Sequence, residues 1–405
     1  MTETKQQAID FYNAGLAHMR EGRLAEARAC YEQAIALDPR YVRAHHNLAT
    51  VLDDLGEHER AEAHFRAAIA ADPNAAEPWA GLGGNQRLRG RLSAARQAYE
   101  HALDLRVEFP AARWNLALID LAEGKFASGW TNYLFRPTAD RGKAPLVQLA
   151  SDLTGIIVDI VDEQGLGDAL FFLRFAPALR ARGAVLRYEC DPRLAGIVER
   201  MIDSGSVTAN TATVRVALGD LPYVLGADTA PPVPVRALTD RLAAMTARLR
   251  AAGPPPFIGL TWRAGQRVDS FLFKEVPPER LGKALLTAPG TLIDLQRKPL
   301  HGEHATLEKV LGRSVADFSA HNDDLEDMLA LMSLLDDYVG VSNTNMHLRA
   351  AAGRPARVLI PNPAEYRWMV AGKESPWFPG FRLYRQAANG NWDNALNRLA
   401  DDLRA

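Results

Sequence analysis

The first residues with a potential for chemistry lie in a turn that follows an apolar run. Ile156–Val161 is rich in β-branched residues and predicts a buried strand. It leads into Glu163–Asp168, which reads Glu-Gln-Gly-Leu-Gly-Asp, and the two glycines allow a tight turn into a helix. Asp168 stands where a helix N-cap belongs, at the mouth of an α/β sheet, where such folds place their chemistry. The turn alone does not decide whether Asp168 only caps the helix or does chemistry.

A second turn has the composition of an anion site. The strand-like run Tyr338–Val341 leads into Ser342–Leu348, which reads Ser-Asn-Thr-Asn-Met-His-Leu. Small polar residues at a helix start leave backbone N–H groups free, and the helix dipole adds partial positive charge there. We therefore expect this turn to hold phosphate or diphosphate. The alternatives are a helix that is only well capped and a His347 that belongs to the core.

Cations gather in loops of the same region. Arg263 follows the first strand after the Pro-rich segment, Lys274 lies in the next loop, and Gln296, Arg297 and Lys298 end another strand. Loops that follow parallel strands meet at one edge of the sheet. Their convergence with a helix start predicts a diphosphate pocket.

These loops require two α/β lobes to position them. Strand-like and helical runs alternate from about residue 143, which predicts parallel sheets. We expect Rossmann-like lobes at 150–252 and 257–390, separated by prolines 254–256, with a cleft between the lobes. The last helix, within 391–405, is expected to cross back onto the first lobe.

The N-terminal third repeats itself every 34 residues. Asp38-Pro39 recurs at Asp72-Pro73, and small and aromatic residues recur in register: Ala27, Ala61 and Ala95; Tyr31, Phe65 and Tyr99. Small residues let two helices approach, and aromatic residues fill the gaps between stacked pairs. The pattern resembles tetratricopeptide repeats, with three copies and a degenerate fourth through Trp130 and Tyr133, and assigns residues 1–140 to an α-solenoid. We expect the fourth copy to dock on the next domain.

A row of asparagines suggests a peptide-binding surface in the repeats. Asn13, Asn47 and Asn115 share one repeat position, which Gly81 interrupts in the third copy. Amides at matched spacing could bind the backbone of an extended protein or peptide. The alternative is that asparagine is simply common at this position in such repeats.

Composition and net charge limit the classes of partner and the cellular compartment that we expect for this protein. The 405 residues carry a net charge of −2, so no global field recruits nucleic acid or an anionic membrane. The two cysteines, Cys30 and Cys190, lack metal-ligand spacing and read as buried thiols of a reducing compartment. The first residues lack an apolar signal core, and no run approaches a membrane span, so we expect a cytoplasmic protein.

Residues 150–405 resemble GT-B glycosyltransferases of the heptosyltransferase-like branch, especially forms fused to tetratricopeptide repeats. The matching stretches are Glu163–Asp168 with Phe172–Pro177, Gly259–Gly265, Leu295-Gln296, Val341–Leu348 with Gly353–Pro355, and Tyr366–Trp368 with Ser375–Trp377.

The resemblance implies an inverting, metal-independent transferase that takes sugar from a nucleotide-sugar donor, UDP-type by default, without a cofactor or metal. It implies that Asp168 is the general base. It also implies that the helix start holds the leaving diphosphate while Lys274 and Arg263 neutralise it. The donor-side residues are Arg263, Lys274, Gln296, Asn343, Thr344, Asn345, Met346 and His347.

One departure keeps other functions open. Asn343 stands where many relatives carry aspartate, which keeps the shape but loses the charge. The alternatives are an inactive binding scaffold and a transferase that acts on a glycan or small molecule. The sequence does not identify the nucleotide base, the sugar, the acceptor or the oligomeric state, although repeat stacks often support homo-oligomers.

Overall fold

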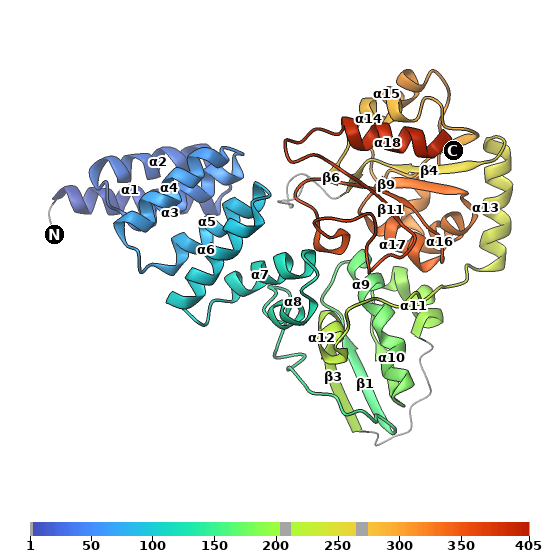
Figure 1. Cartoon of the computed structure of the whole chain (residues 1–405), viewed down its shortest axis with the longest axis horizontal. Helices are drawn as coiled ribbons and strands as arrows, with labels where there is room; N and C mark the ends of the chain where they lie inside the picture. The colour runs from blue at the N-terminus through green and yellow to red at the C-terminus, as the bar shows by residue number, and fades with distance from the viewer. Residues whose placement is uncertain (1–2, 203–211, 265–273, 405) are drawn as a thin grey trace. The chain divides into compact units, whose positions relative to one another are not determined.

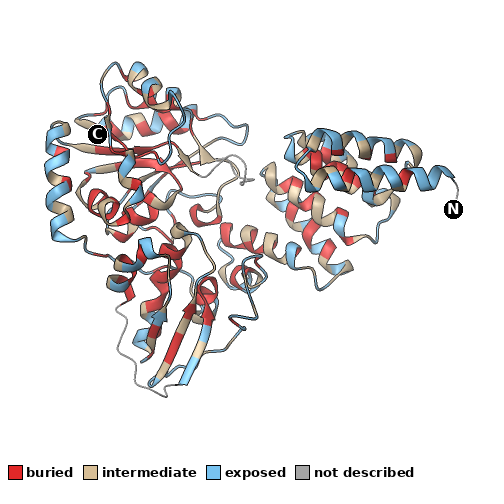
Figure 2. Cartoon of the chain, turned by 180° about the vertical axis from the view of Figure 1, so that it is seen from behind, coloured by how far each residue is buried: buried red, intermediate tan, exposed pale blue. Residues whose placement is uncertain are grey.

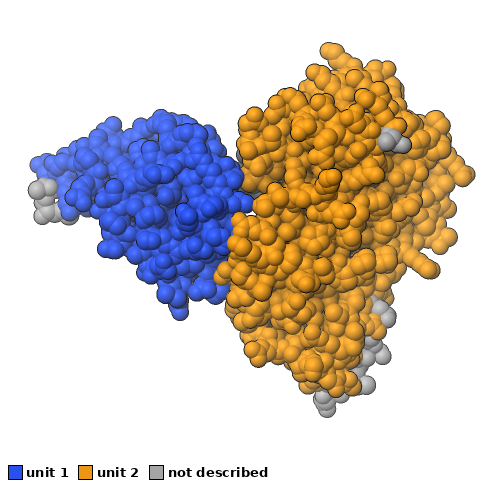
Figure 3. Space-filling view, in the orientation of Figure 1, with its two compact units in different colours: residues 1–119, 135–137 blue, residues 120–134, 138–405 orange. Residues whose placement is uncertain are grey.

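The computed structural model describes residues 3–202, 212–264 and 274–404. Its chain forms two compact units, Met1–Ile119 with Phe135–Pro137 and Asp120–Leu134 with Thr138–Ala405 (Figure 3). Gly265, in the expected turn after the first strand of the second lobe, and Asp203, the expected end of one helix, lie outside the described residues.

The first unit is built from helices that pack as antiparallel neighbours, each pair contacting the next (Figure 1). The helices are α1 (Glu3–Arg20), α2 (Leu24–Leu37), α3 (Val42–Asp54), α4 (His58–Ala71), α5 (Ala76–Leu88) and α6 (Leu92–Leu105). Helix α7 (Pro110–Ala122) begins in this unit and ends in the second. Their buried residues, red in Figure 2, concentrate on the faces between helices.

Glycines opposite aromatic rings explain the close packing of these helices. A Cβ atom built on Gly15 would lie 2.5 Å from the ring of Tyr31, and one built on Gly83 would lie 2.8 Å from the ring of Tyr99. Tyr31 and Tyr99 are themselves buried. The 34-residue spacing of small and aromatic residues therefore records one helix-to-helix contact made repeatedly.

Helix α8 (Phe126–Tyr133) belongs to the second unit. The indole Nε1 of Trp130 donates to the carbonyl of Ala227 at 2.9 Å, and its ring centroid lies 5.5 Å from that of Trp377. Helix α8, the last part of the degenerate fourth repeat, thus packs on the α/β part of the second unit. The compact boundary falls after Ile119 rather than at 140, because the aromatic face of α8 is buried in the second unit.

A three-stranded parallel sheet opens the α/β part. It consists of β1 (Ile156–Val161), β2 (Val185–Tyr188) and β3 (Ala212–Ala217), in the order β2-β1-β3. The helix expected after β1 is broken into α9 (Leu166–Phe172), the 3-10 turn η1 (Leu173–Phe175) and α10 (Ala176–Ala181). Pro177 occupies the first turn of α10, where its missing N–H costs nothing. The lobe also contains η2 (Pro192–Leu194), α11 (Ala195–Ile202), η3 (Leu218–Asp220) and α12 (Leu221–Leu225).

A six-stranded parallel sheet follows. Its strands are β4 (Phe257–Thr261), β7 (Thr291–Asp294), β8 (Ala316–Asp317), β9 (Asp337–Val341), β10 (Arg357–Ile360) and β11 (Arg382–Arg385). The strand order is β11-β10-β9-β4-β7-β8. After β4 the chain adds β7 and β8 on one side of it, and then adds β9, β10 and β11 on the other side. This is the strand order of doubly wound sheets, whose ligands bind where the direction reverses, beyond the carboxyl ends of β4 and β9.

Helices and short strands complete this lobe. They are α13 (Thr239–Ala252), β5 (Arg263–Ala264), β6 (Lys274–Glu275), α14 (Pro278–Ala284), α15 (Glu303–Leu311), η4 (Ser319–Asp323), α16 (Leu325–Leu334), α17 (Thr344–Ala351), η5 (Tyr366–Trp368) and α18 (Asp393–Arg404). β5 and β6 pair as an antiparallel hairpin.

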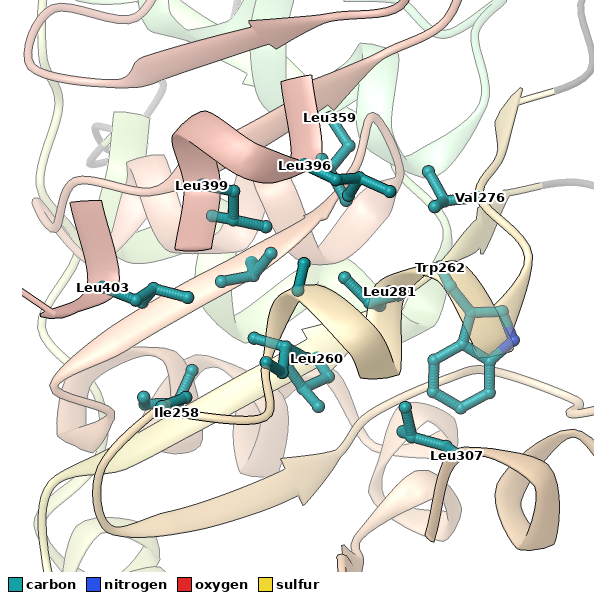
Figure 4. Close-up of a cluster of buried hydrophobic side chains, with 14 of the residues drawn as sticks. Ile258, Leu260, Trp262, Val276, Leu281, Leu307, Leu359, Leu396, Leu399 and Leu403 are labelled. Atoms are coloured by element: carbon teal, nitrogen blue, oxygen red, sulfur yellow. The ribbon is translucent and has the colours of Figure 1, made fainter. Parts of the chain in front are cut away.

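The expectation that the last helix crosses back to the first lobe is wrong. Leu396, Leu399 and Leu403 on α18 lie in the same buried cluster as Ile258 and Leu260 of β4 (Figure 4). α18 also contacts α14 and β11. Its apolar stripe is covered by the second sheet and by the helix beside it, so none is left for the first lobe.

The glycine contacts generate a stability prediction. Gly83→Ala adds a Cβ atom 2.8 Å from buried Tyr99, whereas Gly84→Ala adds one whose nearest neighbour, the Tyr99 hydroxyl, lies at 3.6 Å. Overpacking costs about 1–3 kcal/mol, and replacing a helical glycine by alanine returns about 1 kcal/mol. We expect Gly83→Ala to be less stable than Gly84→Ala by about 2 kcal/mol in urea unfolding followed by circular dichroism. Equal stabilities would contradict the packing role of Gly83.

Candidate functional site

A cavity of about 430 Å³ lies at the point where the six-stranded sheet reverses direction. It is lined by Arg263, Ala264, Gln296, Arg297, Lys298, Leu300, Asn322, Asn343, Thr344 and Asn345. Five of the eight residues that the sequence assigned to the donor side are among them. Lys274, Met346 and His347 are not.

Gln296 holds the wall of the cavity together. Its Oε1 accepts from the backbone N–H groups of Trp262 at 3.0 Å and Arg263 at 2.9 Å. Its Nε2 donates to the carbonyl of Arg263 at 3.1 Å. Both ends of this buried amide are used within the protein, so Gln296 joins the ends of β4 and β7 and positions Arg263.

An ion pair lies behind Gln296. Buried Asp294 accepts from the Gln296 N–H at 2.7 Å through Oδ1, and its Oδ2 lies 2.7 Å from Nδ1 of His304 on α15. Burial raises the pKa of Asp294. Burial opposes protonation of His304, but its hydrogen bond to Asp294 and the nearby carboxylates outweigh this and raise the pKa of His304. The pair fastens α15 to the strand that carries Gln296.

Arg263 is also engaged within the protein. Its guanidinium pairs with Glu303 at 3.3 Å and donates to the carbonyl of Lys298 at 3.0 Å. Lys298 has φ of 47°, in the left-handed region that a residue with a Cβ seldom adopts. Arg263 therefore does not enter the cavity as a free cation, as the sequence suggested, because Glu303 already balances its charge.

The start of α17 is capped by Asn343. Its Oδ1 accepts from the N–H of Met346 at 3.1 Å, and its Nδ2 donates to Oγ1 of Thr261 at 3.0 Å. A carboxylate at this position could cap the helix but could not donate to Thr261. The N–H groups of Thr344 and Asn345, both cavity-lining residues, have no acceptor in the described part of the chain. They remain available to an anion.

Met346 and His347 point into the core instead. Met346 is fully buried, and His347 is 6% exposed with its ring 5.5 Å from that of Phe378 and 6.3 Å from that of Phe171. Burial, reinforced by nearby cations, lowers the pKa of His347 well below its usual value, so its imidazole is neutral at pH 7. Only the first part of the expected Thr344–His347 anion site therefore lines the cavity.

Asp168 is the third residue of α9, not its N-cap. The N-cap residue is Gly165, which has an extended backbone conformation, and the helix begins at Leu166. No side chain caps this helix. The prediction that Asp168 is the cap is therefore wrong. The Asp168 side chain is 38% exposed and forms an ion pair with Arg367 of η5.

Arg367 begins a chain of alternating charges. The 7% exposed Arg367 pairs with Asp168 and with Glu365, and Glu365 pairs with Lys274 at 2.5 Å and accepts from the hydroxyl of Ser342 at 3.0 Å. Burial alone would raise the pKa of Glu365, but Lys274 and Arg367 hold it below its usual range. Burial likewise opposes the charge on Arg367, and Asp168 with its other neighbours holds the pKa of Arg367 well above its usual value. Lys274, expected to neutralise a diphosphate, already has a carboxylate partner.

Sequence reasoning did not assign roles to Glu365 and Arg367. The Arg367 guanidinium lies 4.7 Å from the ring centroid of Tyr366 and 4.8 Å from that of Phe171. The available signal was two charges beside the aromatic pair Tyr366 and Trp368, in a loop after a predicted strand. Charges in such a setting are buried and need partners.

The asparagines of the first unit do not form a uniform row. Asn47 donates to the hydroxyl of Tyr12 at 3.2 Å, and Asn115 donates to the carbonyl of Ala111 on its own helix at 2.8 Å. Asn13 is exposed. Two of the three amides thus use a donor within the repeats.

The described residues show neither a metal-binding cluster nor a membrane-spanning helix. They contain no group of three or more histidine, cysteine, aspartate or glutamate side chains placed to hold a metal ion. None of the helices in these ranges is both long enough and apolar enough to cross a membrane.

Comparison with known proteins identifies the repeats. A family model described as tetratricopeptide repeat matches residues 12–76. The first unit contains tetratricopeptide repeats. Protein FlbA of Caulobacter vibrioides is 28% identical in an alignment 441 residues long. The alignment covers 98% of this chain and 67% of FlbA. Human Tetratricopeptide repeat protein 7B is 35% identical over 101 residues, 25% of this chain and 12% of that protein.

A solved structure, the first tetratricopeptide domain of Spaghetti (RPAP3) bound to an HSP90 peptide, is 24% identical to part of the chain. It covers 29% of this chain and 94% of that domain, with a TM-score of 0.29.

The capping role of Asn343 can be tested by two substitutions. Asn343→Ala removes the acceptor for the Met346 N–H and should cost about 1 kcal/mol of unfolding free energy. Asn343→Asp keeps the acceptor and places a negative charge at the positive end of α17, so it should cost less. Urea unfolding of both variants checks this. An equal loss would mean that donation to Thr261, not capping, is what Asn343 contributes.

The Asp294–His304 pair predicts a pH dependence of stability. Because the pKa of His304 is raised on folding, its stabilisation is complete below the unfolded pKa of about 6.5 and is lost as the pH rises through the folded pKa. The free energy difference between wild type and His304→Gln, measured by urea unfolding from pH 6 to pH 9, should therefore shrink with rising pH. A constant difference would show that the contact is not an ion pair.

Proposed function

We propose that the chain is an inverting, metal-independent GT-B glycosyltransferase that moves a sugar from a nucleotide-sugar to a protein or peptide held by the repeats. The observation that carries the proposal is the placement of Asp168. This accessible carboxylate lies on α9, which packs against α17, and the start of α17 lines the cavity at the reversal point of the sheet.

The donor half of the proposal rests on the cavity. Its volume of about 430 Å³ falls within the range of small-molecule sites, about 300–1,000 Å³. The N–H groups of Thr344 and Asn345 and the positive end of α17 favour a leaving diphosphate. Arg297 and Lys298 add positive charge to the lining. Together these groups would stabilise the charge that develops on the leaving group.

The acceptor half rests on Asp168. An acceptor nucleophile would attack the anomeric carbon of the sugar, the bond from that carbon to the diphosphate oxygen would break, and Asp168 would take the nucleophile's proton. Arg367 holds the Asp168 carboxylate on one side. The Asp168 side chain is 38% exposed, which leaves room for an acceptor on the other side. The reaction needs no cofactor beyond the donor, for which we adopt a UDP-sugar as the first choice.

The repeats supply the proposed means of holding the acceptor. Stacked helical repeats form extended surfaces that bind other polypeptides. Asn13 is exposed and can reach a peptide backbone, whereas Asn47 and Asn115 would do so mainly through their amide oxygens.

A binding scaffold without transferase activity is the second candidate. Two of the cations expected to bind phosphate, Lys274 and Arg263, are paired with Glu365 and Glu303. Asn343 adds no charge at the helix start. These observations favour a cavity with weaker anion affinity than that of an active transferase.

A donor screen separates the two candidates. Thermal unfolding of the full chain would be followed with UDP-, GDP-, ADP- and dTDP-sugars, because a ligand of the native state at 100 times its dissociation constant adds about 2.7 kcal/mol. A stabilising donor supports the transferase, and no shift with any donor supports the scaffold.

With a donor in hand, Asp168→Asn tests the base. We expect transfer to fall by at least about 10²-fold while donor affinity stays within twofold, since the base acts on the acceptor. Asp240→Asn, which changes a 78% exposed aspartate on α13 in the same way, is the matched control and should leave transfer unchanged. Normal turnover of Asp168→Asn would exclude this residue as the base. Transfer to free sugars but not to peptides would point to a glycan or small-molecule acceptor.

A further inference from the structure

The Glu365 carboxylate contacts Lys274, which the sequence assigned to phosphate binding. Glu365 lies 2.5 Å from the ammonium of Lys274 and accepts from the hydroxyl of Ser342 at 3.0 Å. Ser342 directly precedes Asn343, the cap of α17. The Glu365 side chain is 11% exposed and that of Lys274 is 25% exposed, so the pair is partly screened from water, and Lys274 keeps some exposed surface.

Carboxylate and phosphate oxygens accept from the same donors. A Lys ammonium binds either as a compact positive charge, and a serine hydroxyl donates to either. An anion that approaches Lys274 must therefore replace Glu365 or be repelled by it, and in a partly buried site this repulsion is only weakly screened.

Glu365 can release Lys274 without losing every partner. Arg367, which is 7% exposed, pairs with Glu365 and also with Asp168. If Lys274 turned to a ligand, the Glu365 carboxylate would keep Arg367 and Ser342 as donors. The exchange would thus leave no buried charge unpaired, which would otherwise be costly.

We propose that Glu365 is an internal counter-anion that competes with a diphosphate group for Lys274. Glu365 holds Lys274 in place and sets how tightly a diphosphate must bind to displace it. The proposal rests on the proposed function only in taking the diphosphate of a nucleotide-sugar as the natural ligand. The competition itself is a property of the side chains of Glu365 and its partners Lys274, Ser342 and Arg367.

The test uses inorganic diphosphate as the probe and the full chain as the protein. Isothermal titration at fixed ionic strength would compare wild type with Glu365→Gln, which keeps the shape of the side chain but removes its charge. We expect the variant to bind diphosphate about tenfold more tightly, because a like charge next to the ligand has been removed. Glu374→Gln, an exposed loop residue, makes the same change in net charge and should alter affinity by less than about twofold.

A double variant assigns the gain to Lys274. Adding Lys274→Gln to Glu365→Gln should abolish the tighter binding. Circular dichroism would establish that each variant is folded. If Glu365→Gln does not fold, Lys274→Gln alone still tests the proposal, which requires it to bind diphosphate more weakly than wild type.

Three results would overturn the proposal: equal affinity of wild type and Glu365→Gln, an equal gain in Glu374→Gln, or a gain that survives loss of Lys274. The outcome is separable from that of the donor screen. Tighter diphosphate binding without any nucleotide-sugar shift would retain the counter-anion and reject the transferase, and the reverse pattern would reject only the counter-anion.

Discussion

The close approach of α9 to α17 is the contact on which the candidate site depends. A Cβ atom built on Gly167 would lie 3.0 Å from Cδ2 of His347 and 3.5 Å from the Cα atom of Thr344. A side chain at this position would crowd His347, so glycine allows the start of α9 to lie this near the start of α17. The contact buries His347 and keeps it neutral, and it places Asp168, one residue further along α9, beside the helix whose start lines the cavity.

The charged side chains around this buried contact are paired with one another. Asp168, Arg367, Glu365 and Lys274 alternate in sign and together carry no net charge. Removing one partner from such a set would leave an uncompensated buried charge, which explains why the cations are committed to protein carboxylates. The N–H groups of Thr344 and Asn345, which have no acceptor among the described residues, and the cationic side chains of the cavity lining are then what remains for an incoming anion.

Patterns that repeat locally were predictable from the sequence. The 34-residue spacing predicted the repeats, because each copy makes the same contact between a small residue and an aromatic ring, as Gly83 and Tyr99 do. Buried strands with β-branched residues were also predicted. β8, α15 and β11 were not, since β8 has two residues and β11 reads Arg-Leu-Tyr-Arg, without the apolar run of a buried strand. The course of α18 was mispredicted, because the sequence shows that a helix has an apolar stripe but not which surface covers it.

The sequence by itself determined the tetratricopeptide repeats, the parallel α/β alternation and most of the loop residues that line the cavity, because each follows from short-range pattern and from the rule that loops after parallel strands share an edge. Tertiary structure alone decided which charges are free. Lys274 and Glu365 are 91 residues apart, and Asp168 and Arg367 are 199 apart. No local pattern links such positions. Pairing and burial depend on the fold that brings them together, and so the fold decides whether a lysine awaits a ligand or already has a partner.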